Sequence, residues 1–266
     1  MNDTPKRSYG QKSIRLSVKP QDLMSEPSFR PGIWTARIIT LFPQAFPGVL
    51  GESLTGRALT EGKWRLETTD LREFGVGKHR NVDDTPAGGG AGMVLRPDVL
   101  GDAIEHTLRD VRGACPLVYL SPRGRRFDQT TARAWSQCDG LTLLCGRFEG
   151  VDQRVLDHYG IEEVSLGDFV LTGGEIAAQA MIDATVRLLP AVLGNADSIV
   201  DESHSHGLLE HPQYTRPAVW NGLEIPEVLM SGHHGKVEEW RRHMAEEITR
   251  QRRPDMWDAY KAAKDK

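Results

Sequence analysis

The sequence predicts an α/β protein built on a mostly parallel sheet. Short apolar, β-branched runs alternate with stretches of helical spacing, which is typical of βαβ units. Glycine-bearing segments directly follow several of these runs, as ligand-binding loops do at the carboxyl ends of parallel strands. With 266 residues, of which 39% are hydrophobic and 26% charged, the chain has the composition of a globular protein rather than a disordered one.

The first predicted strand covers residues 36–43, which are apolar and β-branched until Pro43 ends the run. Further strands are predicted at residues 116–120, 141–145 and 161–170, and the last of them runs into a loop. A helix is predicted over residues 128–137, because Asp128 can cap its amino end.

A long helix is predicted over residues 175–189, which Pro190 ends. It is apolar on more than one face, which fits a core helix or a core helix that also makes a dimer contact. Residues 196–210 are polar and rich in Ser, Asp and His, and predict a linker. Val237, Trp240, Met244 and Ile248 then follow helical spacing, which predicts a small helical domain over residues 211–266.

Residues 1–33 contain prolines and glycines without a sustained period, and we expect a flexible extension before a domain of residues 34–195. The 33 basic and 37 acidic residues give a net charge of −4, so nucleic acid would have to be bound by local patches. The chain has no apolar run of about 18 residues, so we expect no contact with a membrane. It also lacks the apolar core of a secretory signal, and we expect a cytoplasmic protein.

Three glycine-bearing loops, at residues 121–125, 146–150 and 167–174, follow predicted strands, and a fourth glycine-rich segment lies at residues 88–92. Each alone is typical of an ordinary turn, but three after successive strands favour a ligand site. The sequence lacks GxGxxG, GxxxxGK[ST], HExxH and GxSxG, which argues against dinucleotide, NTPase, zinc-protease and serine-hydrolase sites. Three cysteines without CxxC spacing and two His pairs without cysteine partners predict no metal site.

Five segments together are similar to the bacterial tRNA (guanine-N1)-methyltransferase family. They are VDDTPAGGGAGMVL at 82–95, LSPRGR at 120–125, LLCGRFEGVDQRV at 143–155, SLGDFVLTGGE at 165–175 and HPQYTRP at 211–217. Their order and spacing match the family, which makes the set far more specific than any one loop. The resemblance implies a SPOUT-class fold, in which the sheet is threaded into a deep trefoil knot that binds S-adenosylmethionine. It also implies a homodimer with a shared RNA site, and methylation of N1 of the guanosine at tRNA position 37.

By this resemblance, loop residues hold the adenine, ribose and methionine parts of the methyl donor. They are Tyr119, Leu120, Ser121, Pro122, Gly146, Glu149, Leu166, Gly167, Asp168, Phe169, Val170, Leu171, Gly173 and Gly174. Backbone groups in rigid loops can recognise an adenine edge, and nearby carboxylates favour the cationic sulfonium.

The acceptor, guanine N1, carries a proton that a base must remove, and negative charge then builds on O6. The resemblance assigns the cation near O6 to Arg187 and the base to Glu202, where the family has aspartate; a one-residue shift would give the role to Asp201. It places Asp83 near the target base. Without the resemblance, Arg187 would be interpreted as a snorkelling surface residue and the two acids as part of a solvated linker.

Two departures from the family remain, since Ala87 and Arg123 stand where the family has an aromatic residue and glutamine. Neither removes a catalytic group. Basic patches for RNA are at residues 78–80, at Arg216 and along the C-terminal helices. Alternative functions are a SPOUT-class RNA 2′-O-ribose methyltransferase and a non-catalytic RNA-binding module.

Overall fold

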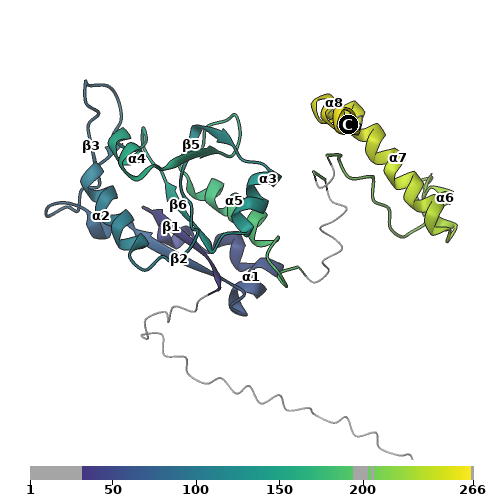
Figure 1. Ribbon diagram of the computed structural model, residues 1–266, viewed down its shortest axis with the longest axis horizontal. Helices are drawn as coiled ribbons and strands as arrows, with labels where there is room; N and C mark the ends of the chain where they lie inside the picture. Colours follow the sequence, from purple (N-terminus) through teal and green to yellow (C-terminus); the bar gives the residue numbers. More distant parts are fainter. Residues whose placement is uncertain (1–31, 194–202, 205–206, 265–266) are drawn as a thin grey trace, which may run out of the picture. The chain divides into compact units, whose positions relative to one another are not determined.

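The computed structural model describes residues 32–193, 203–204 and 207–264, so the predicted N-terminal extension and most of the predicted linker lie outside the described residues. Residues 32–193 contain a five-stranded sheet with the order β2–β1–β6–β5–β7 (Figure 1). All its pairings are parallel. The strands are β1 (Trp34–Thr40), β2 (Trp64–Asp70), β5 (Leu117–Arg126), β6 (Gly140–Cys145) and β7 (Glu162–Ser165).

Helices cover both faces of this sheet. The helices α1 (Ser53–Thr60), α3 (Gln129–Ser136) and α5 (Glu175–Val186) contribute to one apolar cluster. The helices α2 (Pro97–Leu108) and α4 (Gln153–Tyr159) contribute to the other. Neighbouring residues of β1 pack on opposite faces of the sheet, since fully buried Ile38 belongs to the first cluster and fully buried Ile39 to the second. The α/β prediction is thereby confirmed as a three-layer arrangement around a parallel sheet.

The long predicted helix is observed as α5, which ends earlier than the sequence indicates. Its buried residues include Met181 and Ile182, which makes it a core helix. After Val186 the amides of Leu188 and Leu189 bond to carbonyls three residues back, so the chain tightens into a narrower turn before Pro190. Ile176 at the other end of α5 is 64% exposed and takes no part in this core.

The strand β5 is interrupted by a bulge. Leu120 and Arg125 both pair with Val164 of β7, so the residues between them loop out and the pairing then resumes. Gly124 lies in the bulge, and a Cβ there would stand 2.3 Å from the carbonyl carbon of Glu163. Because β5 and β7 approach so closely, only glycine fits at this position.

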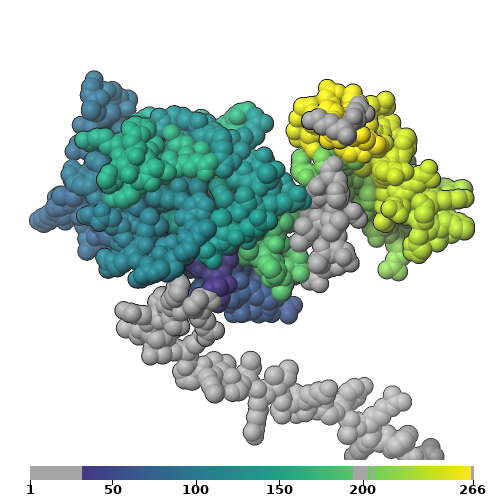
Figure 2. Space-filling model, in the orientation of Figure 1, coloured from purple at the N-terminus to yellow at the C-terminus, as the bar shows by residue number. Residues whose placement is uncertain are grey.

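A short hairpin, β3 (Asp83–Asp84) and β4 (Val94–Leu95), carries the glycine-rich segment. The loop between its strands extends away from the sheet and forms a protrusion in the space-filling view (Figures 1 and 2). The Leu95 amide donates to the Gly150 carbonyl, and the Glu149 amide donates to the Met93 carbonyl. The hairpin is therefore tied to the loop that follows β6.

The C-terminal residues form a hairpin and three helices. They are β8 (Val219–Trp220), β9 (Leu223–Glu224), α6 (Glu227–Met230), α7 (His234–Arg252) and α8 (Pro254–Lys264). Asn221 and Gly222 between the two strands both have positive φ, as a type I′ turn requires. The helical spacing predicted around Trp240 is confirmed by α7. The buried Thr249 hydroxyl accepts a hydrogen bond of 2.8 Å from the Leu209 amide, which fixes the preceding segment to this helix.

Candidate functional site

A pocket of about 240 Å³ opens at the bulge of β5 and at the ends of β6 and β7. Loops 119–122, 146–150 and 164–174 form its walls, so the three glycine-bearing loops do meet at one edge of the sheet. Every residue predicted to hold the methyl donor lines this pocket except Asp168. The Asp168 carboxylate instead forms an exposed ion pair with Arg126. The lining residues that the sequence analysis did not predict are Arg147, Phe148, Gly150, Val164, Ser165, Thr172 and Ala177.

At two glycines in the pocket lining, a side chain would collide with a neighbouring residue. A Cβ on Gly146 would lie 2.7 Å from Cε2 and 2.8 Å from the hydroxyl of Tyr119. Tyr119 is buried, and this burial raises the pKa of its phenol. A Cβ on Gly174 would lie 2.8 Å from Cα of Cys145, so α5 begins in direct contact with the end of β6. The backbone of these loops is therefore accessible to a ligand.

A buried ion pair joins the pocket wall to the start of α5. Arg147 Nη2 donates to Glu175 Oε2 over 2.8 Å, and the Glu175 side chain is only 5% exposed. The second carboxylate oxygen accepts a 2.7 Å hydrogen bond from the Thr40 hydroxyl at the end of β1. The Arg147–Glu175 pair therefore links the ends of β6 and β1 to the start of α5.

The Arg147 guanidinium has further contacts. Its Nη1 donates to the Thr172 carbonyl over 3.2 Å, and its central carbon lies 4.4 Å from the centre of the Phe42 ring. Its Nε is buried and has no hydrogen-bond partner in the described part of the chain. A Cβ on Gly173 would lie 2.2 Å from this Nε, so glycine is needed there for the guanidinium to fit. The loop after β7 is thus fixed against the loop after β6.

Glu149 supplies the carboxylate in the pocket lining, and it is exposed. The glycine-rich segment lies directly over it, since a Cβ on Gly92 would stand 2.4 Å from Glu149 Oε1. Asp83 pairs in register with Leu95 on the same hairpin and is half-buried. The hairpin thus brings Asp83 to the side of the sheet on which the pocket opens.

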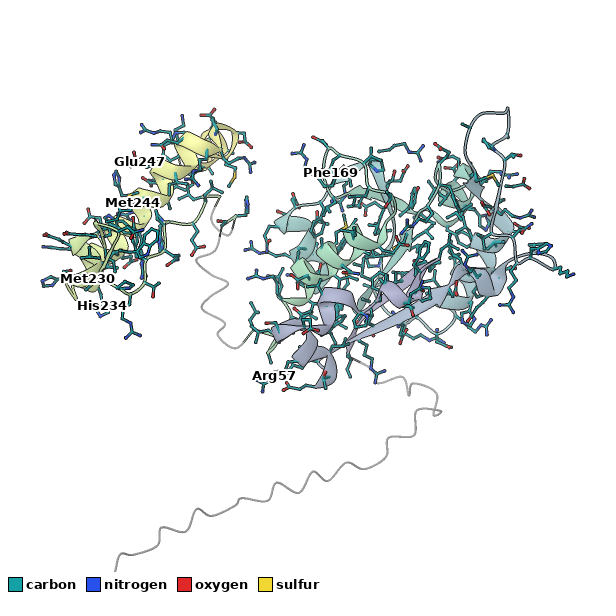
Figure 3. The ribbon with its side chains drawn as sticks, turned by 180° about the vertical axis from the view of Figure 1, so that it is seen from behind. Arg57, Phe169, Met230, His234, Met244 and Glu247 are labelled. Atoms are coloured by element: carbon teal, nitrogen blue, oxygen red, sulfur yellow. The ribbon has the colours of Figure 1, made fainter. Side chains whose placement is uncertain are left out.

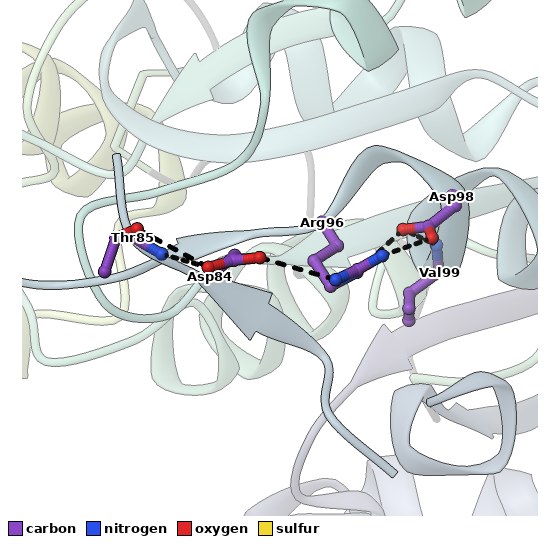
Figure 4. A network of polar contacts seen from close by, with 5 residues as sticks. All are labelled: Asp84, Thr85, Arg96, Asp98 and Val99. Atoms are coloured by element: carbon purple, nitrogen blue, oxygen red, sulfur yellow. Dashed lines mark hydrogen bonds and ion pairs between the residues drawn. The ribbon is translucent and has the colours of Figure 1, made fainter. Parts of the chain in front are cut away.

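The adjacent Asp84 has its own charged partners (Figure 4). Arg96 Nη1 lies 3.4 Å from Asp84 Oδ2, and Arg96 Nη2 lies 2.7 Å from Asp98 Oδ2. The hydrogen bond from Arg96 lowers the pKa of Asp98. Asp84 also accepts a 2.8 Å hydrogen bond from the Thr85 amide. Asp84 and Arg96 brace the base of the hairpin, which leaves Asp83 as the acid with no such role in holding it.

The predicted catalytic residues do not line this pocket. Arg187 is the half-buried residue that follows α5, and about 15 Å of helix at 1.5 Å per residue separates it from Ala177, the last pocket-lining residue on α5. Asp201 and Glu202 lie outside the described residues. Over the described residues, no three His, Cys, Asp or Glu side chains gather as metal ligands would, and none of the helices is long and apolar enough to span a membrane.

Comparisons with known proteins identify the family of this chain. The sequence model of the family described as "tRNA (Guanine-1)-methyltransferase TrmD" matches residues 35–259. A protein named tRNA (guanine-N(1)-)-methyltransferase from Ruegeria sp. (strain TM1040) is 70% identical over 91% of this chain and 100% of its own length. Proteins with the same name from Ruegeria pomeroyi and Rhodospirillum rubrum are 75% and 57% identical, over 88% and 86% of this chain and 96% and 95% of their own lengths. The chain therefore belongs to the tRNA (guanine-N1)-methyltransferase family.

Proposed function

We propose that this protein methylates N1 of the guanosine at tRNA position 37, with S-adenosylmethionine as the donor. The observation that carries the proposal is the pocket at the bulge of β5 and the ends of β6 and β7, built from the loops on which the family resemblance rests. The relatives' printed names specify guanine N1, which leaves the alternative ribose 2′-O reaction without support. The deep trefoil knot of the SPOUT class and a cytoplasmic location are part of the same proposal.

The donor pocket suits a cationic ligand that is recognised by its adenosine. A Cβ on Gly146, Gly173 or Gly174 would collide with Tyr119, Arg147 or Cys145, so glycine lets these loops pack closely, and their backbone groups can bond an adenine edge. Arg147 is neutralised by Glu175, so Glu149 contributes to the lining a negative charge that no ion pair among the described residues offsets. When bound, S-adenosylmethionine supplies a methyl group that is already activated for transfer to nitrogen.

The acceptor chemistry requires a base for the N1 proton and a cation near O6. We assign the base to Glu202 or Asp201 and the cation that stabilises charge on O6 to Arg187. Because about 15 Å of helix separates Arg187 from Ala177, the last lining residue on α5 of its own chain, we infer that it serves the pocket of a second copy. The exposed apolar side chains of Phe169, Val170 and Ile176, the first of which is labelled in Figure 3, support such a homodimer.

The test is mass spectrometry of nucleosides after incubation with the donor and an unmodified tRNA. We expect 1-methylguanosine from a transcript with guanosine at position 37 and none from a transcript with adenosine there. Methylated ribose, or no methylated nucleoside at all, would overturn the proposal. Arg187→Ala should lower the transfer rate by at least 100-fold while donor binding, measured by calorimetry, stays within twofold.

The two acids can be distinguished with one further pair of variants. Glu202→Gln and Asp201→Asn each remove one carboxylate and keep the size of the side chain. Only the variant that lacks the base should lose the rise of the single-turnover rate with pH. If both variants lost this pH dependence equally, or if neither lost it, the assignment of a single base to this segment would be contradicted.

A further inference from the structure

A second concave surface lies in the C-terminal region. It is a groove of about 280 Å³ between the 211–217 segment, α6 and the first half of α7. We call it the α7 groove. Trp240 of α7 is its half-buried aromatic base, and Met230, labelled in Figure 3, lines it from the end of α6.

Two rings pack edge-on against Trp240. The centre of the Tyr214 ring lies 6.1 Å from that of Trp240 at an angle of 61° between the ring planes. The His211 ring lies 6.3 Å away at 60°. Tyr214 is nevertheless 47% exposed, so Trp240 holds it in place without covering it. A fixed and exposed aromatic ring is a platform on which a planar group can stack.

The charge of the α7 groove is positive. Its lining contains Arg216 and Arg241 and no aspartate or glutamate. The neighbouring hollow along the same helix is different, since Lys236 and Arg242 there stand among Glu239 and Glu246. The α7 groove is therefore the one that complements an anion.

An aromatic platform with two guanidinium groups beside it matches the chemistry of an unstacked nucleotide. Single-stranded RNA is bound by stacking its bases on aromatic rings while basic side chains contact its phosphates. Guanine N1 lies on the Watson–Crick edge, so an enzyme that alkylates it must work on an unpaired base, and placing that base in an active-site pocket takes it out of its stack. The neighbours of such a base lose a stacking partner and become available to another surface.

We propose that the α7 groove binds one unpaired nucleotide of the tRNA other than the one that is methylated. Its base stacks on Tyr214, and its phosphate groups pair with Arg216 and Arg241. This proposal rests on tRNA being the substrate, as proposed above. It makes the groove a second point of RNA recognition with its own side chains, separate from the donor pocket.

The experiment is direct binding of tRNA to the full-length protein without the methyl donor, at several salt concentrations. Tyr214→Ala should weaken binding by roughly tenfold or more, and Tyr214→Phe should restore it to within about twofold, because phenylalanine keeps the ring. Arg241→Ala should weaken binding and reduce the slope of log K against log salt by about one. Arg57→Ala, at an exposed arginine of α1 outside the predicted RNA patches, is the control and should leave both quantities unchanged within error.

Further measurements keep the outcomes apart. Circular dichroism and thermal melting should show each variant folded, and donor affinity should equal that of the unsubstituted protein. The proposal would be overturned if Tyr214→Ala bound tRNA as tightly as the unsubstituted protein, or if Arg241→Ala and Arg57→Ala lost equal amounts of affinity. Dissociation of a dimer by Tyr214→Ala would overturn it too, because the groove would then be a contact between copies. If the unsubstituted protein binds tRNA but transfers no methyl group, the proposed function fails while the groove stands.

Discussion

The buried ion pair beside the donor pocket gives the sharpest test of the structural argument. Glu175→Gln keeps the size of the side chain and an acceptor for the Thr40 hydroxyl, but it removes the charge that faces Arg147. The guanidinium then remains in the pocket wall without its counter-ion. We expect a loss of stability and, since the pocket becomes more positive, weaker binding of a cationic donor.

The magnitude follows from how deeply each partner is buried. Removing one member of a buried pair destabilises a protein by about 3–5 kcal/mol. The Arg147 side chain is 25% exposed, and its bond to the Thr172 carbonyl remains, so we expect about 2 kcal/mol. For a protein of this size that lowers the melting temperature by about 4–8 °C. The exposed pair of Arg57, labelled in Figure 3, with Glu61 is the control, and Glu61→Gln should leave the melting temperature unchanged within error.

Thermal melting and calorimetry with two ligands form the assay. S-adenosylmethionine is cationic at sulfur, whereas S-adenosylhomocysteine has a neutral thioether. Glu175→Gln should therefore weaken the binding of S-adenosylmethionine more than that of S-adenosylhomocysteine. The double variant Arg147→Met with Glu175→Gln should recover part of the lost stability, because neither charge is then left alone. Equal weakening of both ligands would refute the electrostatic reasoning. An unchanged melting temperature would refute the claim that the pair holds the loops together.

Three further outcomes are expected. Gly146→Ala should weaken donor binding by roughly tenfold in calorimetry, because the new methyl group meets the buried Tyr119 ring. Asp128→Ala should lower the free energy of unfolding in urea by about 1 kcal/mol, because it removes the carboxylate that accepts a hydrogen bond from the Thr131 amide and caps α3. Its bond to Thr131 lowers the pKa of Asp128, so this cost should be complete above pH 3.8 and vanish as the pH falls below it. Burial raises the pKa of Cys145, so iodoacetamide at pH 8 should alkylate it only in the unfolded chain.

Much of the sheet could be predicted because its central strands are buried on both faces. The run 141–145 is apolar except for Thr142, and the observed β6 (Gly140–Cys145) is buried at every position. Strand β2 was not predicted, because it lies at the edge of the sheet and carries the polar sequence WRLETTD. The cap expected at Asp128 is confirmed, since its side chain accepts a 2.7 Å hydrogen bond from the Thr131 amide.

The part of the candidate site that could be predicted is the part built from loops that directly follow strands in the sequence. The glycine loops come directly after strands, so parallel topology alone brings them together. The pairing of Arg147 with Glu175 could not be found in this way, because 28 residues separate them and nothing in their spacing indicates contact. The same is true of Asp168, whose side chain turns to Arg126 instead of the pocket.

The bulge in β5 has a consequence for how this pocket can change. Most loops tolerate insertions because only their ends are fixed and the rest meets solvent. Here Leu120 and Arg125 are both aligned with Val164, and the residues between them supply Ser121 and Pro122 to the pocket wall. Lengthening or shortening this stretch by one residue would shift the register of everything after it against β7. We therefore expect that the pocket beside Ser121 and Pro122 can be widened only by substituting residues, not by inserting or deleting them. Variants designed to accept a bulkier alkyl donor should keep the length of this stretch.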